Sequence, residues 1–156
     1  MRKGVINGVL FVFVTLIAVA VDQLSKAYIA RYMQPGDSVA IIPGVFHITY
    51  VQNPGAAFGI FAYRTEFFIT TAILFLFVVL VLLFYLPTNP KVTIPMSILT
   101  GGVLGNMIDR LRTRYVVDFI DFRIWPVLNL ADIFIFVGAV FIFIYLFTKG
   151  GVKEIG

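Results

Sequence analysis

The stretch FFITTAILFLFVVLVLLFYL, residues 67–86, decides the fold class, because its twenty residues include no charged side chain. A helix that crosses the hydrocarbon core of a bilayer needs about 20 consecutive apolar residues. The whole chain agrees, since of its 156 residues 60% are hydrophobic, 16% are aromatic and only 13% are charged. So few charged side chains cannot cover a soluble domain, and the sequence predicts an integral membrane protein.

Three more apolar stretches flank this one, and together they predict an all-α membrane protein with four transmembrane helices. The expected helices cover approximately residues 5–25, 67–86, 92–110 and 130–148. No second domain is indicated, so residues 1–156 are expected to form a single integral-membrane domain.

The third expected helix is the least apolar, and its small residues recur in a pattern. Ser97, Gly101 and Gly105 are spaced every four residues, and Asp109 continues the same stripe. Small side chains let a neighbouring helix approach closely. We therefore expect this stripe to contact another helix, and Asp109 to face protein rather than lipid.

The first apolar stretch supports two interpretations. Met1-Arg2-Lys3, the apolar run and Ala18-Val19-Ala20 imitate a cleavable signal peptide. The run is long for such a peptide, however, and Asp22, Ser25 and Lys26 follow at helical spacing, as if the helix continued. A retained membrane anchor is the expectation, and sequencing the mature N-terminus would separate the two interpretations.

The region between the first two expected helices is the longest polar-rich part of the chain. Phe46–Val51 alternates as a half-buried strand does, and Pro35-Gly36, Pro43-Gly44 and Asn53-Pro54-Gly55 mark turns. We expect a small β-sheet cap at the membrane surface, formed by approximately residues 37–63 between helices 1 and 2.

Polar side chains gather at the ends of the predicted spans, where they are costly. An acidic residue at the centre of a membrane helix costs roughly 2.5–3.5 kcal/mol on insertion scales, so such residues indicate function. Four spans place the end of helix 1, the first loop, the end of helix 3 and the start of helix 4 on one side. One site is expected there, formed by Asp22, Lys26, Asn53, Asn106, Asp109, Arg110, Asp118, Asn129 and Asp132. Lysine and arginine occur on both sides, so charge alone leaves the orientation open.

Structural roles compete with functional ones for several of these residues. Asp22 and Lys26 form an i,i+4 pair that would equally well stabilise the end of helix 1. Asn129 and Asp132 have the spacing of a helix N-cap and its third helical residue. Asp118 is the strongest catalytic candidate, because its flanking residues are apolar and desolvation would raise its pKa.

The available residue types narrow the chemistry. The chain has no cysteine, and its one histidine, His47, lies in the strand pattern and is expected to be structural. A serine or cysteine triad and a zinc site therefore lack support, whereas magnesium on carboxylates stays open. Two aspartates are the economical catalyst: one carboxylate takes a proton from water while its protonated partner polarises the scissile carbonyl.

The remaining charges point to no further site. The net charge is +4 and the basic residues are scattered, so no nucleic-acid partner is expected. Apart from Asp118, the charged side chains between the third and fourth expected helices are expected to be solvated or to face lipid headgroups; they are Arg112, Arg114, Asp121 and Arg123.

Five motifs, in this order along the chain, resemble those of the lipoprotein signal peptidases (signal peptidase II), membrane aspartic proteases of bacteria. They are Asp22-x-x-Ser25-Lys26, Asn53-x-Gly55-Ala56-Ala57-Phe58-Gly59, Gly101-Gly102-x-x-Gly105-Asn106-x-x-Asp109-Arg110, Val117-Asp118-Phe119 and Asn129-x-Ala131-Asp132. The resemblance implies cleavage of diacylglyceryl-modified prolipoproteins just before the lipidated cysteine. It also implies a multi-pass protein of the bacterial inner membrane with both termini in the cytoplasm, an extracytoplasmic sheet and active site, and no metal or other cofactor. We expect a monomer among membrane lipids.

By the same resemblance, Asp118 and Asp132 would form the catalytic dyad. The residues that would bind substrate or support the site are Asp22, Lys26, Asn53, Gly55, Asn106, Asp109, Arg110, Asn129 and Ala131. Leu128 stands where the family often has phenylalanine, which bears on local packing rather than on the chemistry. The motifs do not say which aspartate is the base.

Two other classes of function stay open. A small proton-coupled transporter would also keep acids in the membrane, but such proteins usually show internal repeats and sites near the midplane. A magnesium-dependent lipid-headgroup transferase would need closely spaced acids, whereas Asp118 and Asp132 are separated in the chain and no glycine-rich phosphate loop is present. Loss of activity in a chelator would favour the transferase.

Overall fold

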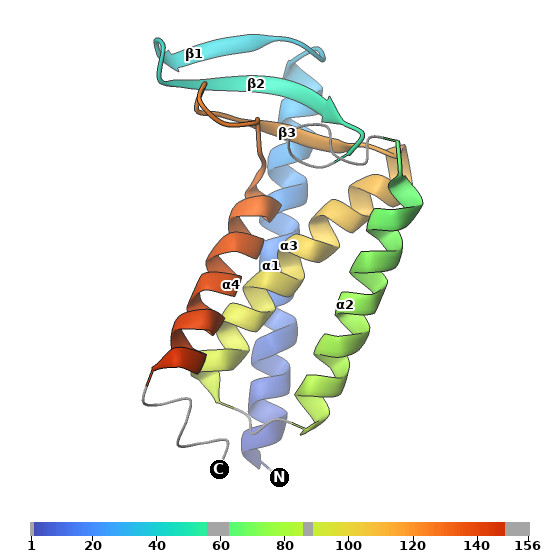
Figure 1. The fold of residues 1–156 in the computed structure, drawn as a ribbon, viewed down its shortest axis with the longest axis vertical. Coiled ribbons are helices and arrows are strands. Elements are labelled where there is room, and N and C mark those ends of the chain that lie inside the picture. Colours follow the sequence, from blue (N-terminus) through green and yellow to red (C-terminus); the bar gives the residue numbers. More distant parts are fainter. Residues whose placement is uncertain (1, 56–62, 86–88, 149–156) are drawn as a thin grey trace.

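The fold combines a helical bundle with a small sheet at one end (Figure 1). The computed structural model describes residues 2–55, 63–85 and 89–148; the expected cap residues 56–62 and the end of the second expected helix at residue 86 lie outside them. In chain order the elements are α1 (Arg2–Tyr32), β1 (Ser38–Ile42), β2 (Phe46–Asn53), α2 (Thr65–Tyr85), α3 (Pro90–Thr113), β3 (Val116–Asp121) and α4 (Leu130–Phe147).

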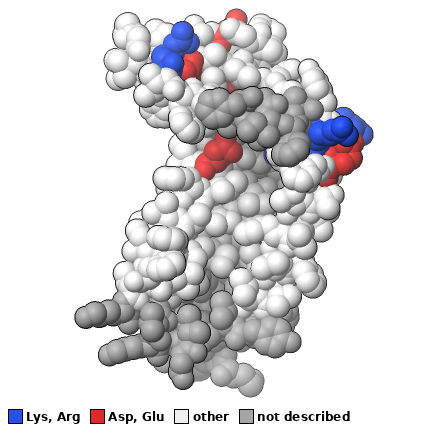
Figure 2. Space-filling model, viewed as in Figure 1, with Lys and Arg blue, Asp and Glu red and all other residues white. Residues whose placement is uncertain are grey.

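Three of the four helices are long and apolar enough to cross a membrane. These spans are Asn7–Tyr32 in α1, Thr65–Leu83 in α2 and Leu130–Phe147 in α4. On the face shown in Figure 2, the described part of the bundle carries no charged side chains over most of its length. The protein is therefore a multi-pass membrane protein, while membrane crossing by α3, which carries the charged residues of the third expected helix, stays a prediction.

Helix α1 is longer than expected, since it continues to Tyr32 instead of ending near residue 25. Neither proline nor glycine occurs between the expected end near residue 25 and Pro35, so the backbone is free to continue as helix. The extra turns also bury apolar surface, because Ile29 packs in one cluster with Tyr50 and Phe119 of the sheet.

The sheet has three antiparallel strands in the order β1-β2-β3. The strand expected at Phe46–Val51 is confirmed as part of β2, but the expectation that the cap comes only from the segment between helices 1 and 2 is wrong. Strand β3 follows α3, and its pairing with β2 places Asp118 opposite Val51. Sequence alternation predicts a strand but does not name its partner, so this long-range pairing was not visible beforehand.

Helix α3 crosses obliquely in front of α1 in Figure 1 and packs against both α1 and α4, and small residues allow this close packing. Ser97, Gly101, Gly105 and Asp109 are all buried, which confirms that the stripe faces protein. A Cβ atom added to Gly101 would lie 2.5 Å from Ala18 Cβ on α1. Such contact leaves no room for a larger side chain, so the stripe brings α1 and α3 together.

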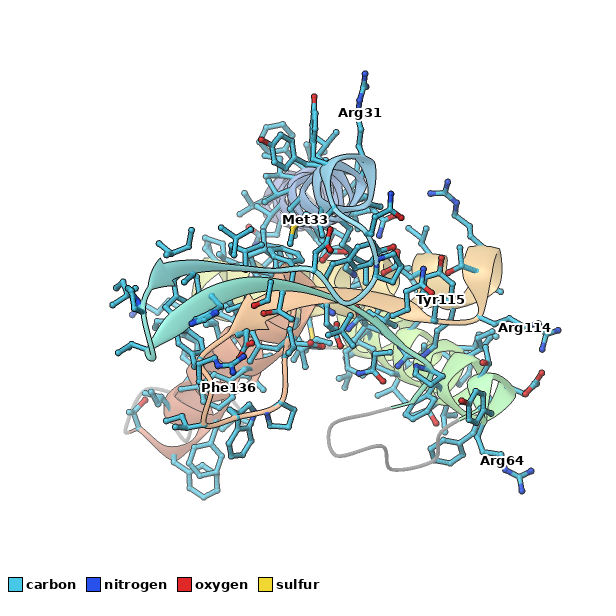
Figure 3. All side chains as sticks on the ribbon, turned by 90° about the horizontal axis from the view of Figure 1, so that it is seen from above. Arg31, Met33, Arg64, Arg114, Tyr115 and Phe136 are labelled. Atoms are coloured by element: carbon cyan, nitrogen blue, oxygen red, sulfur yellow. The ribbon has the colours of Figure 1, made fainter. Side chains whose placement is uncertain are left out.

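The sheet lies over one end of the bundle, opposite the start of α1 and the end of α4 (Figure 1). Viewed from above, Arg31 on α1 and Phe136 on α4 lie on opposite sides of the sheet, and Arg64 and Arg114 extend outward (Figure 3). The sheet end therefore receives the end of α1, the end of α3 and the start of α4, as the parity of four helices requires.

Candidate active site

Asp118 and Asp132 line the same cavity, between the sheet and the bundle. The cavity has a volume of about 470 Å³ and is also lined by Asn53, Asn106 and Arg110. Figure 2 shows acidic side chains in a hollow below the sheet end. Asp118 comes from β3 and Asp132 from the first turn of α4, so the fold joins two acids that lie fourteen positions apart in the sequence.

The electrostatics of the cavity act on Asp118 most strongly. Burial, followed by repulsion from the charge of Asp132, raises the pKa of Asp118 from 3.8 to about 7, although hydrogen bonds from Asn53 and Asn129 oppose this shift. The raised pKa expected from the apolar Val-Val-Asp-Phe context is thus confirmed. A carboxyl group with this pKa can hold or release a proton near neutral pH.

Asn53 and Asn129 present their amide groups to Asp118. Asn129 Nδ2 donates to Asp118 Oδ1 at 2.6 Å, and Asn53 Nδ2 donates to Asp118 Oδ2 at 2.8 Å. A backbone N–H group fixes the orientation of each amide, because the N–H of Gly55 donates to Asn53 Oδ1 and that of Asp132 donates to Asn129 Oδ1. Each amide must therefore turn its NH₂ group toward Asp118.

A third asparagine, Asn106, presents its amide group to Asp132. Its Nδ2 donates to Asp132 Oδ1 at 2.8 Å, while its Oδ1 accepts from Lys26 Nζ at 2.9 Å. An ammonium group can only donate hydrogen bonds, so the charge of Lys26 fixes which end of the Asn106 amide faces Asp132. Each oxygen of the two aspartates thus receives an oriented donor, the second donor to Asp132 being the backbone N–H of Asn129 at 3.2 Å.

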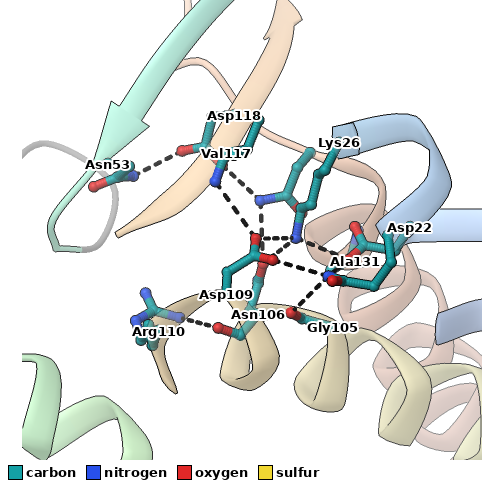
Figure 4. A network of polar contacts seen from close by, with 12 residues as sticks. Asp22, Lys26, Asn53, Gly105, Asn106, Asp109, Arg110, Val117, Asp118 and Ala131 are labelled. Carbon is teal, nitrogen blue, oxygen red and sulfur yellow. Dashed lines mark hydrogen bonds and ion pairs between the residues drawn. The ribbon is translucent and has the colours of Figure 1, made fainter. Parts of the chain in front are cut away.

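Lys26 is the centre of a buried charge network (Figure 4). Its side chain is only 3% exposed, and its Nζ lies 2.8 Å from Asp22 Oδ2 and 2.8 Å from Asp109 Oδ2. Together with Asn106, these partners use all three N–H groups of the ammonium. The network joins α1 to α3 and satisfies charges that would otherwise be costly to bury.

Asp22 links α1 to the start of α4. It is completely buried, and its Oδ1 accepts the backbone N–H of Ala131 at 3.0 Å. At the same helix end, Asn129 and Asp132 form a capping box, which confirms the capping interpretation of their spacing. Asp132 thus belongs to the cap and also lines the cavity with Asp118, so a structural role does not exclude the catalytic role that is predicted for it.

Arg110 and Gly55 close another side of the cavity. Arg110 Nη2 donates to the carbonyl oxygen of Gly55 at 2.9 Å, and the guanidinium lies 4.4 Å from the ring centroid of Phe68 on α2. All eleven residues named by the resemblance therefore contribute to one connected site or its walls. Their individual roles in the reaction stay predictions.

Two residues of the site were not named by sequence reasoning. Gln23 Nε2 donates to Asp109 Oδ1 at 2.9 Å and to the Gly105 carbonyl at 3.1 Å, and Phe68 covers Arg110. The position of Gln23 directly after Asp22 was an available signal. Phe68 lies in an aromatic-rich apolar stretch, where nothing in the sequence distinguishes it from a lipid-facing residue.

The expectation that Asp121 is solvated is wrong. The residue is only 4% exposed, and its carboxylate accepts hydrogen bonds from Thr49 at 2.8 Å and from the backbone N–H of Arg123 at 2.8 Å. These donors compensate the loss of water. Arg123 also pairs with Asp121 at 3.1 Å, so this pair stabilises the end of β3.

Comparison with known proteins gives matches over most of the chain. A family model described as signal peptidase (SPase) II matches residues 14–148. The chain is similar to lipoprotein signal peptidases of Moorella thermoacetica, with 44% identity covering 90% of this chain and 95% of the relative, and of Halothermothrix orenii, with 43% identity covering 90% and 97%. Two solved structures described as bacterial membrane enzymes are also similar. One has a TM-score of 0.85 at 34% identity over 92% of this chain and 91% of its own, and the other 0.81 at 35% over 89% and 93%.

Proposed function

Because this chain belongs to the signal peptidase II family, it is a bacterial membrane protease that removes signal peptides from prolipoproteins, and we propose that Asp118 and Asp132 are its catalytic dyad. The observation that carries the proposal is the arrangement of Asn129. Its side chain donates to Asp118 and its backbone N–H donates to Asp132, so one residue holds both carboxyl groups against one cavity.

The proposed reaction is hydrolysis of a peptide bond by water. We assign the shared proton to Asp118, because burial and the charge of Asp132 raise its pKa to about 7. Asp132 then accepts a proton from water as the water oxygen attacks the scissile carbonyl carbon, and Asp118 donates its proton to the carbonyl oxygen. When the tetrahedral intermediate collapses, the C–N bond breaks and the proton on Asp132 passes to the leaving amine. One hydroxyl group of the intermediate returns a proton to Asp118 as the new carboxylic acid forms, which restores the starting protonation of both aspartates.

The proposed substrate is a prolipoprotein that carries a diacylglyceryl group, cleaved just before the lipidated cysteine. The walls of the cavity support a lipid-bearing substrate, because Ile133 and Phe136 of α4 line it together with the dyad. Phe136 is 69% exposed on a helix that is long and apolar enough to span the membrane, so the cavity reaches the lipid-facing surface. An acyl chain would then move from the bilayer to the site without passing through water.

The proposed topology has four spans, both termini in the cytoplasm and the active site on the extracytoplasmic side, in a monomer that needs no metal. Helix α3 has 24 residues, which corresponds to about 36 Å and is long enough to cross the hydrocarbon core. Its charged residues Asp109 and Arg110 lie at the sheet end, where other residues of the site contact them.

The decisive experiment is cleavage of a diacylglyceryl-modified prolipoprotein by purified protein in detergent with a chelator present. Wild type is expected to cleave, and the folded variants Asp118→Asn and Asp132→Asn are each expected to lose activity by at least roughly a thousandfold, because neither can complete the proton transfers. The change in electrophoretic mobility of the precursor reports the reaction.

The other outcomes of this experiment separate the alternatives. Cleavage by both variants would exclude the dyad and direct attention to Asp109 as the next acid of the network. Activity that the chelator abolishes would indicate a metal-dependent reaction instead. A matched control is Asp37→Asn, since Asp37 lies in an exposed turn outside the cavity and its substitution should leave cleavage unchanged.

A further inference from the structure

The loop between β3 and α4 exposes apolar side chains beside the cavity. At its tip, Ile124 is 92% exposed and Trp125 is 60% exposed, and Phe122 is also exposed. Trp125 lines the same cavity as Phe136, an exposed residue on a helix that is long and apolar enough to span a membrane. The apolar loop surface is therefore continuous with the membrane-facing surface of the bundle.

The base of this loop is closed and its charge is paired. Ile120 and Leu128 form an antiparallel bridge, with the Leu128 N–H donating to the Ile120 carbonyl at 3.0 Å and the Ile120 N–H donating to the Leu128 carbonyl at 2.7 Å. The guanidinium of Arg123 lies 3.1 Å from the Asp121 carboxylate. The loop thus presents an apolar tip with a neutralised charge, on a backbone that the bridge holds in place.

We propose that the Phe122–Trp125 loop inserts into the lipid leaflet at the sheet end of the bundle and anchors the cavity entrance there. Trp125 lies five positions before the apolar span that begins at Leu130, and tryptophan is enriched where membrane spans meet the lipid headgroups. Insertion buries the apolar tip of the loop, which would otherwise stay in contact with water. The cavity entrance then faces lipid, and the loop and α4 together determine how deep in the membrane the entrance lies. This inference does not depend on the proposed catalytic dyad.

The test uses the fact that Trp125 is the only tryptophan of the chain, so the intrinsic tryptophan fluorescence reports this loop alone. In nanodiscs, phospholipids brominated near the carbonyl end of the acyl chain are expected to reduce the emission at least roughly twofold. Lipids brominated near the chain terminus should quench less. A double variant, Trp125→Phe with Phe143→Trp, moves the probe to an exposed position further along α4 and should show the reverse order, which calibrates depth.

Substitution at the tip tests the anchoring role. Ile124→Asp is expected to reduce quenching by bromine and to increase quenching by aqueous iodide, whereas the control Ile124→Leu should behave as wild type. Iodide quenching of wild type without any bromine quenching would overturn the proposal. Protection of Trp125 from both quenchers in a dimeric protein would also overturn it, since the surface would then cover a second copy of the chain.

Discussion

Asp118 shows how neighbouring residues change the chemistry of one side chain. An aspartate in water is ionised at neutral pH, but burial and the charge of Asp132 raise the pKa of Asp118 to about 7. The three asparagines that donate to Asp118 and Asp132 each have a fixed amide orientation, because the oxygen of each amide accepts a hydrogen bond from a group that can only donate. Apolar flanking residues indicated the direction of the pKa shift, whereas the amide orientations depend on contacts between distant segments.

The raised pKa predicts a pH dependence of stability. A carboxyl group whose pKa is higher in the folded protein binds more protons when folded, so the stability that it contributes is largest below about pH 4 and is lost as the pH rises to about 7. A shift from 3.8 to about 7 corresponds to a loss on the order of 4 kcal/mol. Unfolding in detergent, followed from about pH 4 to about pH 8, should show this decline.

The variant Asp118→Asn supplies the control for this prediction, because its side chain does not titrate. Its unfolding free energy should lack the decline that wild type shows as the pH rises toward 7. Equal pH dependence in the two proteins would mean that another group is responsible, and the assignment of the shared proton to Asp118 would have to be withdrawn.

At the scale of elements, the small residues of α3 determine how closely α1 and α4 approach. Gly105 faces Asp22 on α1, and a Cβ atom there would overlap Asp22 Oδ2 and lie 3.0 Å from its Cγ. Gly102 faces the backbone carbonyl of Ala131 on α4 in the same way. The glycine spacing was visible in the sequence, but the helices that it would contact were not.

Gly105→Ala is therefore expected to destabilise the protein by about 1–3 kcal/mol, the usual cost of overpacking. Because the added methyl group displaces Asp22, it should also disturb the Ala131 contact at the start of α4 and reduce cleavage. The control is Gly8→Ala, where an added Cβ has nothing within 4 Å. Thermal unfolding in detergent measures the stability of both variants. Equal melting temperatures for Gly105→Ala and Gly8→Ala would show that α1 and α3 can separate without cost.

Removing Lys26 from the buried charge network between α1 and α3 is expected to destabilise the protein more than Gly105→Ala does. Lys26→Met removes the cation and leaves Asp22 and Asp109 buried without it, which typically costs about 3–5 kcal/mol. It also removes one of the two donors to Asn106 Oδ1 and leaves only Asn129 Nδ2 at 3.2 Å, so the amide that faces Asp132 is held less firmly and cleavage should fall even under conditions where the variant is folded. Arg114→Ala is the control, because its ion pair with Glu66 is exposed and should contribute little. A Lys26→Met protein with wild-type activity would contradict the role given to this network.

At the scale of the whole molecule, the cavity between the sheet and the bundle that Asp118 and Asp132 line is also lined by Phe136, an exposed residue of the apolar helix α4. This arrangement predicts that acyl chains contribute to substrate recognition. A few methylene groups, at about 0.8 kcal/mol each, correspond to roughly a hundredfold in binding. An unlipidated precursor should therefore be cleaved with a kcat/KM at least roughly a hundredfold lower. Equal turnover of the two precursors by the purified protein would exclude this mode of recognition.

The sequence by itself determined the membrane class, the four helices, strand β2 and the family, because these follow from local hydrophobicity, periodicity and motif spacing. The tertiary structure alone decided that β3 joins the cap, that α1 continues to Tyr32, that Asp121 is buried, and that Lys26 orients Asn106 toward Asp132. The physical reason is the range of the interactions: a hydrophobic pattern is a property of neighbouring residues, whereas strand partners, charge compensation and hydrogen-bond direction arise only when distant segments meet.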